Sequence, residues 1–143
     1  MVMMFERELV GFDLATMMKL CVVHDLGEAI SGDTPAVDQY RDPCRAERER
    51  RDLIKLCEPL PTDLGREILA LWDDYAAGAS REAAMVKGFD KLETMLQHLV
   101  GLNEPGFDYG FNLTYGVLKT NAHPLLRQIR GVVDAETRKR LVR

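Results

Sequence analysis

The stretch SREAAMVKGFDKLETMLQHL, residues 80–99, carries the clearest structural pattern in the sequence. Its apolar side chains recur at spacings of three and four residues, which places them on one face of an α-helix. Ser80 precedes the pattern, and serine is a preferred N-cap residue. The sequence therefore predicts a long helix that begins after Ser80. Its buried face consists of Ala83, Val86, Phe89, Leu92, Met95, Leu96 and Leu99.

The same helical period continues through most of the chain. Asp13 is a candidate N-cap for a helix that runs to Gly32. Further helices are predicted from Asp42-Pro43 onward, between Thr62 and Gly78, and within residues 124–130 and 135–142. On the first of these, Arg45 should pair with Glu49 on a solvated face, with Leu53, Ile54, Leu56 and Cys57 turned inward. A Gly- and Asn-rich connection is expected over residues 101–115, and no segment alternates like a strand. We therefore predict an all-α helical bundle.

Composition limits the class of protein. The chain has 143 residues, 46% of them hydrophobic and 29% charged, which suits one globular domain over residues 1–143. No apolar run approaches the ~20 residues that cross a bilayer, and residues 1–20 carry too many charges for a signal peptide. Three cysteines leave one without a partner in any disulfide scheme. We therefore expect reduced thiols and a cytoplasmic protein.

Charge is distributed unevenly along the chain. The net charge of −4 argues against a nucleic-acid-binding protein, because such proteins neutralise phosphates. Residues 119–143 nevertheless form a basic C-terminal helical tail. The tail is either an arm that binds an acidic partner or a helix end whose cations are favoured by the helix dipole.

A cluster of ionisable residues lies within VHDLGEAISGD, residues 23–33. On one continuous helix, His24, Asp25 and Glu28 would fall within about 100° of one another. Burying three such groups without a partner is costly. A divalent cation removes that cost, because imidazole nitrogens and carboxylate oxygens are its ligands. An exposed helix end is the alternative setting for the same residues.

A second acidic candidate, Asp90, lies inside the predicted long helix, directly after Phe89. It could reach the same cation from a neighbouring helix. Its alternative is an ion pair with Lys87 or an outward-facing charge. Lys87 and Lys91 are in turn either phosphate contacts or surface lysines beside Asp90.

Together, His24-Asp25, Glu28, Gly32-Asp33 and Asp90-Lys91-Leu92-Glu93 resemble the HD-domain metal-dependent phosphohydrolases, and in particular their 5′-deoxynucleotidase-like branch. The resemblance extends over residues 12–115 and implies an all-α, HD-domain-like helical bundle. It implies that His24, Asp25 and Asp90 are metal ligands. It also implies that Glu28 activates the attacking water and that Asp33 acts near the leaving group or substrate.

The resemblance further implies an upstream metal-ligating histidine, but no histidine precedes His24. We therefore expect either an N-terminally truncated HD-like domain or a degenerate member. The expected cofactor is one divalent metal ion, whether Mn, Co, Mg, Zn, Ni or Fe.

The expected activity is hydrolysis of nucleoside 5′-monophosphates, with deoxynucleotides preferred. The expected partners are a small phosphomonoester and a second copy of the chain, without nucleic acid or membrane. The alternative function is a non-catalytic helical scaffold that associates with itself or with another protein.

Overall fold

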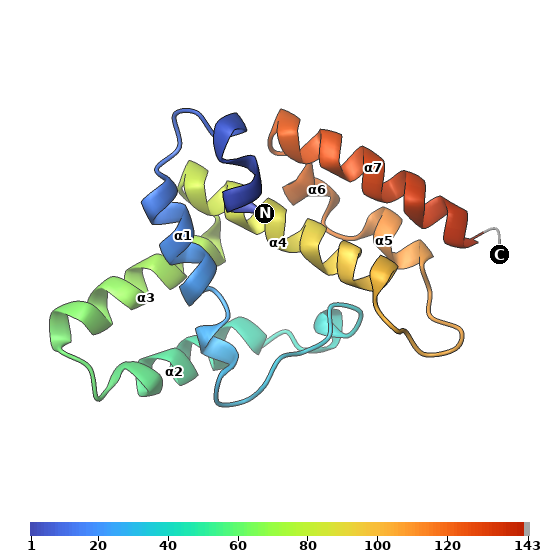
Figure 1. The fold of residues 1–143 in the computed structure, drawn as a ribbon. Helices are drawn as coiled ribbons and strands as arrows, with labels where there is room; N and C mark the ends of the chain where they lie inside the picture. Colours follow the sequence, from blue (N-terminus) through green and yellow to red (C-terminus); the bar gives the residue numbers. More distant parts are fainter. Residues whose placement is uncertain (142–143) are drawn as a thin grey trace. The chain divides into compact units, whose positions relative to one another are not determined.

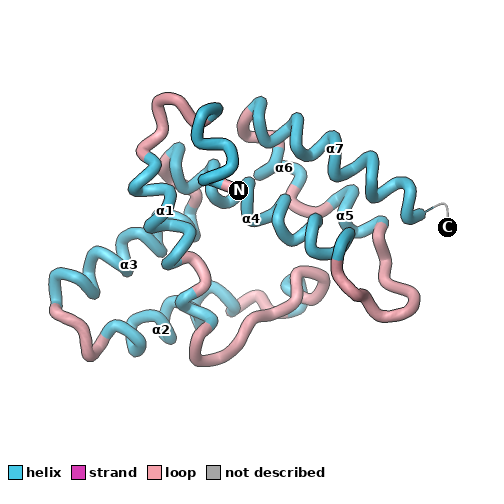
Figure 2. Tube along the Cα trace, viewed as in Figure 1, coloured by secondary structure: helices cyan, strands magenta, loops and turns pink. Residues whose placement is uncertain are grey.

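The computed structural model describes residues 1–141, and every regular element among them is a helix (Figures 1 and 2). The α-helices are α1 (Leu14–Val23), α2 (Arg45–Cys57), α3 (Thr62–Ala77), α4 (Arg81–Val100), α5 (Gly110–Thr114), α6 (Val117–Thr120) and α7 (Pro124–Leu141). The 3₁₀ helices are η1 (Val2–Glu8), η2 (Leu26–Glu28) and η3 (Gln39–Arg41). The all-α prediction is confirmed. In this part of the chain, no helix has the length and apolar character to cross a membrane.

The chain divides into two compact units. The inserted unit is Phe12–Ala83, and the terminal unit combines Met1–Gly11 with Ala84–Arg143. The inserted unit holds His24, Asp25, Glu28 and Asp33, whereas Asp90 belongs to the terminal unit. The single domain expected over residues 1–143 stays a prediction.

In the inserted unit, α3 packs against both α1 and α2, and η2 packs against α2. Asp13 caps α1 as predicted, because its side chain accepts a hydrogen bond from the Thr16 backbone N–H at 3.2 Å. Gly78 ends α3 in the left-handed conformation (φ 63°), which glycine adopts without steric cost. The core lies between α2 and α3 and contains Leu53, Cys57 and Trp72.

The helix predicted from Asp13 to Gly32 is shorter than expected. α1 ends at Val23, and the chain then turns into the 3₁₀ helix η2. Gly27 explains the change of direction, because a Cβ atom there would lie 2.8 Å from the backbone oxygen of Glu49 on α2. Close packing of η2 on α2 therefore overrides the helical period. The prediction that His24, Asp25 and Glu28 share one continuous helix face is wrong.

The first turn of α2 also differs from the prediction. The helix begins at Arg45 rather than at Asp42-Pro43. Leu53 and Cys57 are buried as expected, but Ile54 and Leu56 are 40% and 36% exposed.

The terminal unit is built on α4. Ser80 caps this helix, because its hydroxyl accepts the backbone N–H of Ala83 at 3.0 Å. The predicted apolar face is buried at six of its seven positions and partly buried at Leu96. Phe5 of η1 stacks on Phe89 at 6.0 Å between ring centroids. The helical period therefore located α4 correctly.

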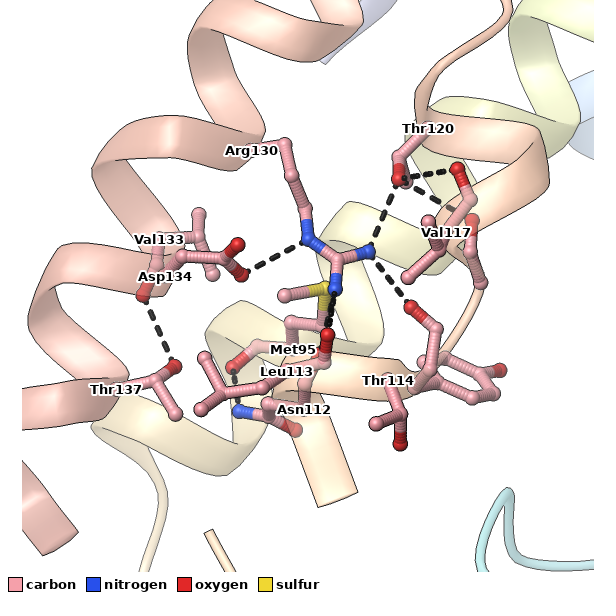
Figure 3. Close-up of polar contacts among 12 residues, drawn as sticks. Met95, Asn112, Leu113, Thr114, Val117, Thr120, Arg130, Val133, Asp134 and Thr137 are labelled. Atoms are coloured by element: carbon pink, nitrogen blue, oxygen red, sulfur yellow. Dashed lines mark hydrogen bonds and ion pairs between the residues drawn. The ribbon is translucent and has the colours of Figure 1, made fainter. Parts of the chain in front are cut away.

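A buried arginine ties α5, α6 and α7 together (Figure 3). Arg130 is 6% exposed and points its guanidinium at fixed acceptors on all sides. These acceptors are the backbone oxygens of Asn112, Leu113 and Tyr115, the hydroxyl of Thr120 and the carboxylate of Asp134. The guanidinium is fully satisfied, which makes Arg130 a structural residue.

The C-terminal segment forms one helix, α7, where two short helices were predicted. Gly131 does not interrupt it. Arg140 of the basic tail donates a hydrogen bond to the backbone oxygen of Leu99 at 2.8 Å. This contact favours the docked helix end over a free arm, although residues 142 and 143 of the tail lie outside the described residues. α5 also lies within the segment that was expected to be a loop.

Candidate metal and carboxylate site

His24 lies at the C-terminal end of α1, where its ring is held by the backbone. Its Nδ1 is 2.9 Å from the carbonyl oxygen of Cys21. A carbonyl oxygen can only accept, so Nδ1 carries a hydrogen and Nε2 is the ring nitrogen left to face Asp25. The ring also lies 5.0 Å from the Tyr75 ring, tilted by 58°. Metal-ligating histidines are oriented in this way by a carbonyl on the other ring nitrogen.

Asp25 faces the free nitrogen of His24. The two atoms, His24 Nε2 and Asp25 Oδ2, are 3.1 Å apart. With a neutral imidazole both atoms are acceptors, so a proton or a cation must lie between or beside them. The His24 side chain is 17% exposed and the Asp25 side chain 66% exposed, which leaves the pair open on one side. The donor atoms of this pair therefore fit a divalent cation.

Glu28 lies in η2 among other carboxylates. Its pKa is raised from the ordinary 4.5 to about 7, with burial as the largest cause. The charges of Asp33, Asp25 and Glu49 act in the same direction, and Arg45 acts against them. Glu28 therefore exchanges a proton near neutral pH, as a general base must.

Asp33 and Glu49 complete the acidic cluster of the inserted unit, which we define as Asp25, Glu28, Asp33 and Glu49. Asp33 follows Gly32 and is exposed, and its charge raises the pKa of Glu28. Glu49 is 9% exposed, and burial raises its pKa while Arg45 and Arg48 lower it. Four carboxylates thus stand beside two guanidinium groups, a local excess of negative charge that suits a divalent cation.

Asp90 lies on α4 in the terminal unit, where its carboxylate is 3.0 Å from the ammonium of Lys91. Both side chains are largely buried, at 23% and 19% exposed. Although burial lowers it, the pKa of Lys91 is raised overall by the charges of Asp90 and Tyr115. Asp90 therefore forms an ion pair with Lys91, and Lys91 also lies over the Tyr115 ring at 5.3 Å.

The structure thus brings together Asp25, Glu28 and Asp33 electrostatically, and it pairs Asp25 with His24. Across residues 1–141, no three or more His, Cys, Asp or Glu side chains are grouped so as to hold a metal ion. Because Asp90 belongs to the other unit, its joining with His24 and Asp25 at one cation stays a prediction.

Sequence reasoning missed Arg45 and Glu49 as members of the cluster. The two were expected to pair on a solvated helix face. They do pair, at 3.0 Å, but their side chains are only 27% and 11% exposed. Glu49 instead precedes the buried Leu53 and Cys57 at intervals of four residues, which places it on the inner stripe of α2. That spacing was the available signal.

Comparison with known proteins identifies the family to which the chain belongs. A sequence profile of the HD domain matches residues 1–130. The chain belongs to the HD domain family. The predicted family membership is therefore confirmed, and HD-domain phosphohydrolases generally depend on divalent metals. No solved structure gives a significant match to this HD-domain chain.

Several relatives of this HD-domain protein carry the name of an activity. The chain is 34% identical over 97 residues to 5′-deoxynucleotidase HDDC2 of Dictyostelium discoideum, which covers 64% of this chain and 51% of that protein. It is 35% identical over 80 residues to 5′-deoxynucleotidase HDDC2 of Homo sapiens, which covers 56% and 39%. It is 31% identical over 84 residues to 5′-deoxynucleotidase YBR242W of Saccharomyces cerevisiae, which covers 56% and 35%. The chain thus matches about half or less of the length of each relative.

Proposed function

We propose that this HD-domain protein is a metal-dependent phosphohydrolase that releases phosphate from nucleoside 5′-monophosphates, with deoxynucleotides preferred. The observation that carries the proposal is the Glu28 carboxyl beside the His24-Asp25 pair, whose pKa is raised to about 7 by burial first and then by the neighbouring carboxylates. The names of the relatives supply the substrate class.

The metal ligands in this proposal are His24, Asp25 and Asp90. A bound divalent cation lowers the pKa of a coordinated water and polarises a phosphoryl oxygen. The fit of His24 and Asp25 rests on their facing acceptor atoms and on the Cys21 carbonyl that orients the imidazole. The identity of the metal, whether Mn, Co, Mg, Zn, Ni or Fe, is left to experiment.

Glu28 is the proposed general base. Near pH 7 about half of the Glu28 carboxyls are ionised, so the group can accept a proton from the attacking water. The water oxygen forms a bond to phosphorus as the bond from phosphorus to the 5′-oxygen breaks. The electron pair of the broken bond stays on the 5′-oxygen, which leaves as the alcohol after it gains a proton.

Asp33 is the proposed proton relay to that leaving oxygen. Its charge is the largest electrostatic contribution, after burial, to the raised pKa of Glu28. This interaction associates Asp33 with the same site as Glu28, and in this proposal Asp33 passes the proton that Glu28 accepts on to the leaving oxygen.

The location and assembly of the protein are proposed on separate observations. We propose a cytoplasmic protein, because Cys21, Cys44 and Cys57 form no disulfide bond with one another. We propose a homodimer, since Met3 and Met4 are 76% and 80% exposed and large apolar side chains favour burial. Analytical ultracentrifugation should give twice the chain mass, and a mass of one chain at all concentrations would contradict the dimer.

The experiment that tests the activity is a phosphate-release assay. Purified protein is incubated with 2′-deoxynucleoside 5′-monophosphates and Mn²⁺ or Co²⁺, and inorganic phosphate is measured. We expect metal-dependent release that EDTA abolishes and that is faster than with the matching ribonucleotides. Release no faster than in the metal-free control would overturn the proposal. The scaffold alternative is less favoured, because the matched relatives are named as deoxynucleotidases.

A further inference from the structure

One guanidinium nitrogen is shared by two carboxylates at the start of α2. Arg45 Nη1 is 3.0 Å from Glu49 Oε1 and 3.5 Å from Glu28 Oε1. The Arg45 side chain is 27% exposed, that of Glu28 18% and that of Glu49 11%. All three groups are therefore largely shielded from water. Charge interactions are stronger in such a shielded site than on an open surface.

The backbone fixes the distance between these groups. η2 packs against α2, and Gly27 lies so close to Glu49 that a side chain would not fit between them. Glu28, the next residue, is thereby held opposite the first turn of α2. The approach of Glu28 to Arg45 follows from this packing rather than from the reach of a flexible side chain.

The charges that act on Glu28 come from both elements and from the adjoining loop. Asp25, Asp33 and Glu49 are the acids, and Arg45 is the cation that opposes them. Arg45 therefore favours the ionised form of Glu28, whereas Glu49 disfavours that form in two ways. Its own charge repels Glu28, and it occupies the same guanidinium nitrogen at the shorter distance.

We infer that Arg45 and Glu49 are positioning residues for Glu28. Arg45 holds the Glu28 carboxylate in place, and Glu49 competes with Glu28 for that guanidinium. The inference rests on the proposed function, in which Glu28 is the base, and it adds two residues to the site. An ion pair that served only to stabilise α2 would make a different prediction, since loss of either partner would then lower the unfolding temperature and leave phosphate release by the folded protein unchanged.

The test compares Arg45→Met with Glu49→Gln. The measured quantity is the titration midpoint of the Glu28 side-chain carboxyl, followed by ¹³C NMR in metal-free protein and, with metal, by the pH profile of kcat/KM. We expect the midpoint to rise in R45M and to fall in E49Q. Phosphate release at pH 7 should fall roughly three- to tenfold in R45M, because less Glu28 is ionised.

Two further variants control for folding. Arg45→Lys keeps the positive charge and should restore most of the wild-type midpoint. Arg50→Met is the matched control on α2, because Arg50 pairs with Asp73 at 2.8 Å away from the cluster. It should leave the Glu28 midpoint unchanged. Thermal unfolding of each variant, followed by circular dichroism, identifies any that do not fold.

Opposite shifts in R45M and E49Q support the inference. Shifts in the same direction, or no shift in either variant, would overturn it. If R45M does not fold, E49Q carries the test: its midpoint should fall while that of R45K stays near wild type, and an unmoved midpoint in E49Q counts against the inference. If the titration midpoints move in opposite directions but the protein releases no phosphate, the proposed function is wrong and the interaction of Arg45 with Glu28 is still supported.

Discussion

Two arginines of low exposure show how differently the two units use the same side chain. In the terminal unit, Arg130 directs its guanidinium at backbone oxygens, one hydroxyl and the single carboxylate of Asp134 (Figure 3). In the inserted unit, Arg45 directs one nitrogen at both Glu28 and Glu49.

The difference lies in the charge balance around each guanidinium. Arg130 meets mostly neutral acceptors, so its network is closed and needs nothing more. The acidic cluster around Arg45 holds more negative charge than its arginines neutralise. Burial, with this excess charge added to it, raises the pKa of Glu28 to about 7. Such an arrangement is costly to folding and is typical of a functional site.

The largest expected effect comes from removing the base of the inserted unit. Glu28→Gln keeps the shape of the side chain but cannot accept a proton. We expect phosphate release to fall by about 10²- to 10⁴-fold, the usual contribution of a general base. Single-turnover assays measure this, and Mn²⁺ binding should be retained. Activity within a few-fold of wild type would remove Glu28 from the mechanism.

In the terminal unit, the corresponding change affects stability. Arg130→Met would leave Asp134 and the oxygens of Asn112 and Tyr115 without their donor in a buried setting. We expect a loss of about 3–5 kcal/mol in the free energy of unfolding, measured by urea denaturation.

Lys139→Met on the same helix is the matched control, since Lys139 forms an exposed pair with Glu136 at 2.6 Å. It should change the free energy of unfolding by less than about 0.5 kcal/mol. An R130M protein as stable as this control would contradict the structural role of Arg130.

The raised pKa of Glu28 also predicts how stability depends on pH. An acid whose pKa is higher in the folded state binds more protons there than in the unfolded chain between pH 4.5 and about 7. Folding stability is therefore lost as pH rises through this window. Metal-free E28Q should be more stable than wild type at pH 8, by on the order of 1–3 kcal/mol, and should match it near pH 4. Parallel pH profiles of unfolding would contradict the shift.

The smallest expected effect is on the exposed pair between α2 and α3. Arg50 and Asp73 form two hydrogen bonds, at 2.8 and 2.9 Å, but both side chains are nearly half exposed. Exposed pairs contribute little because water and salt screen them. Arg50→Met should leave both the denaturation midpoint and phosphate release near wild type. A large loss of either would show that exposure to solvent does not explain the difference between Arg50 and the two shielded arginines, Arg45 and Arg130.

Much of the helical content could be predicted from the sequence, because caps and periodicity are local signals. Ser80 and Asp13 begin their helices as expected, and Gly78 ends α3. The early end of α1 could not be predicted, since it depends on the contact of Gly27 with Glu49, far along the chain. The continuity of α7 was missed, because short helices were predicted over residues 124–130 and 135–142 and the helix continues through the residues between them.

Site residues were predicted only where the residue types and their spacing indicate the chemistry. Glu28 and Asp33 could be named from the sequence, and the structure couples them through charge. Arg45 was assigned to a solvated face, because helical periodicity does not reveal that η2 packs against the first turn of α2.

The central proposal is that His24, Asp25 and Asp90 are ligands of the same cation. Mn²⁺ binding, followed by electron paramagnetic resonance, tests it in wild type, His24→Ala and Asp90→Asn. The account predicts one tightly bound Mn²⁺ per wild-type chain and the loss of that site in both variants. Wild-type binding by D90N, with binding lost only in H24A, would contradict it.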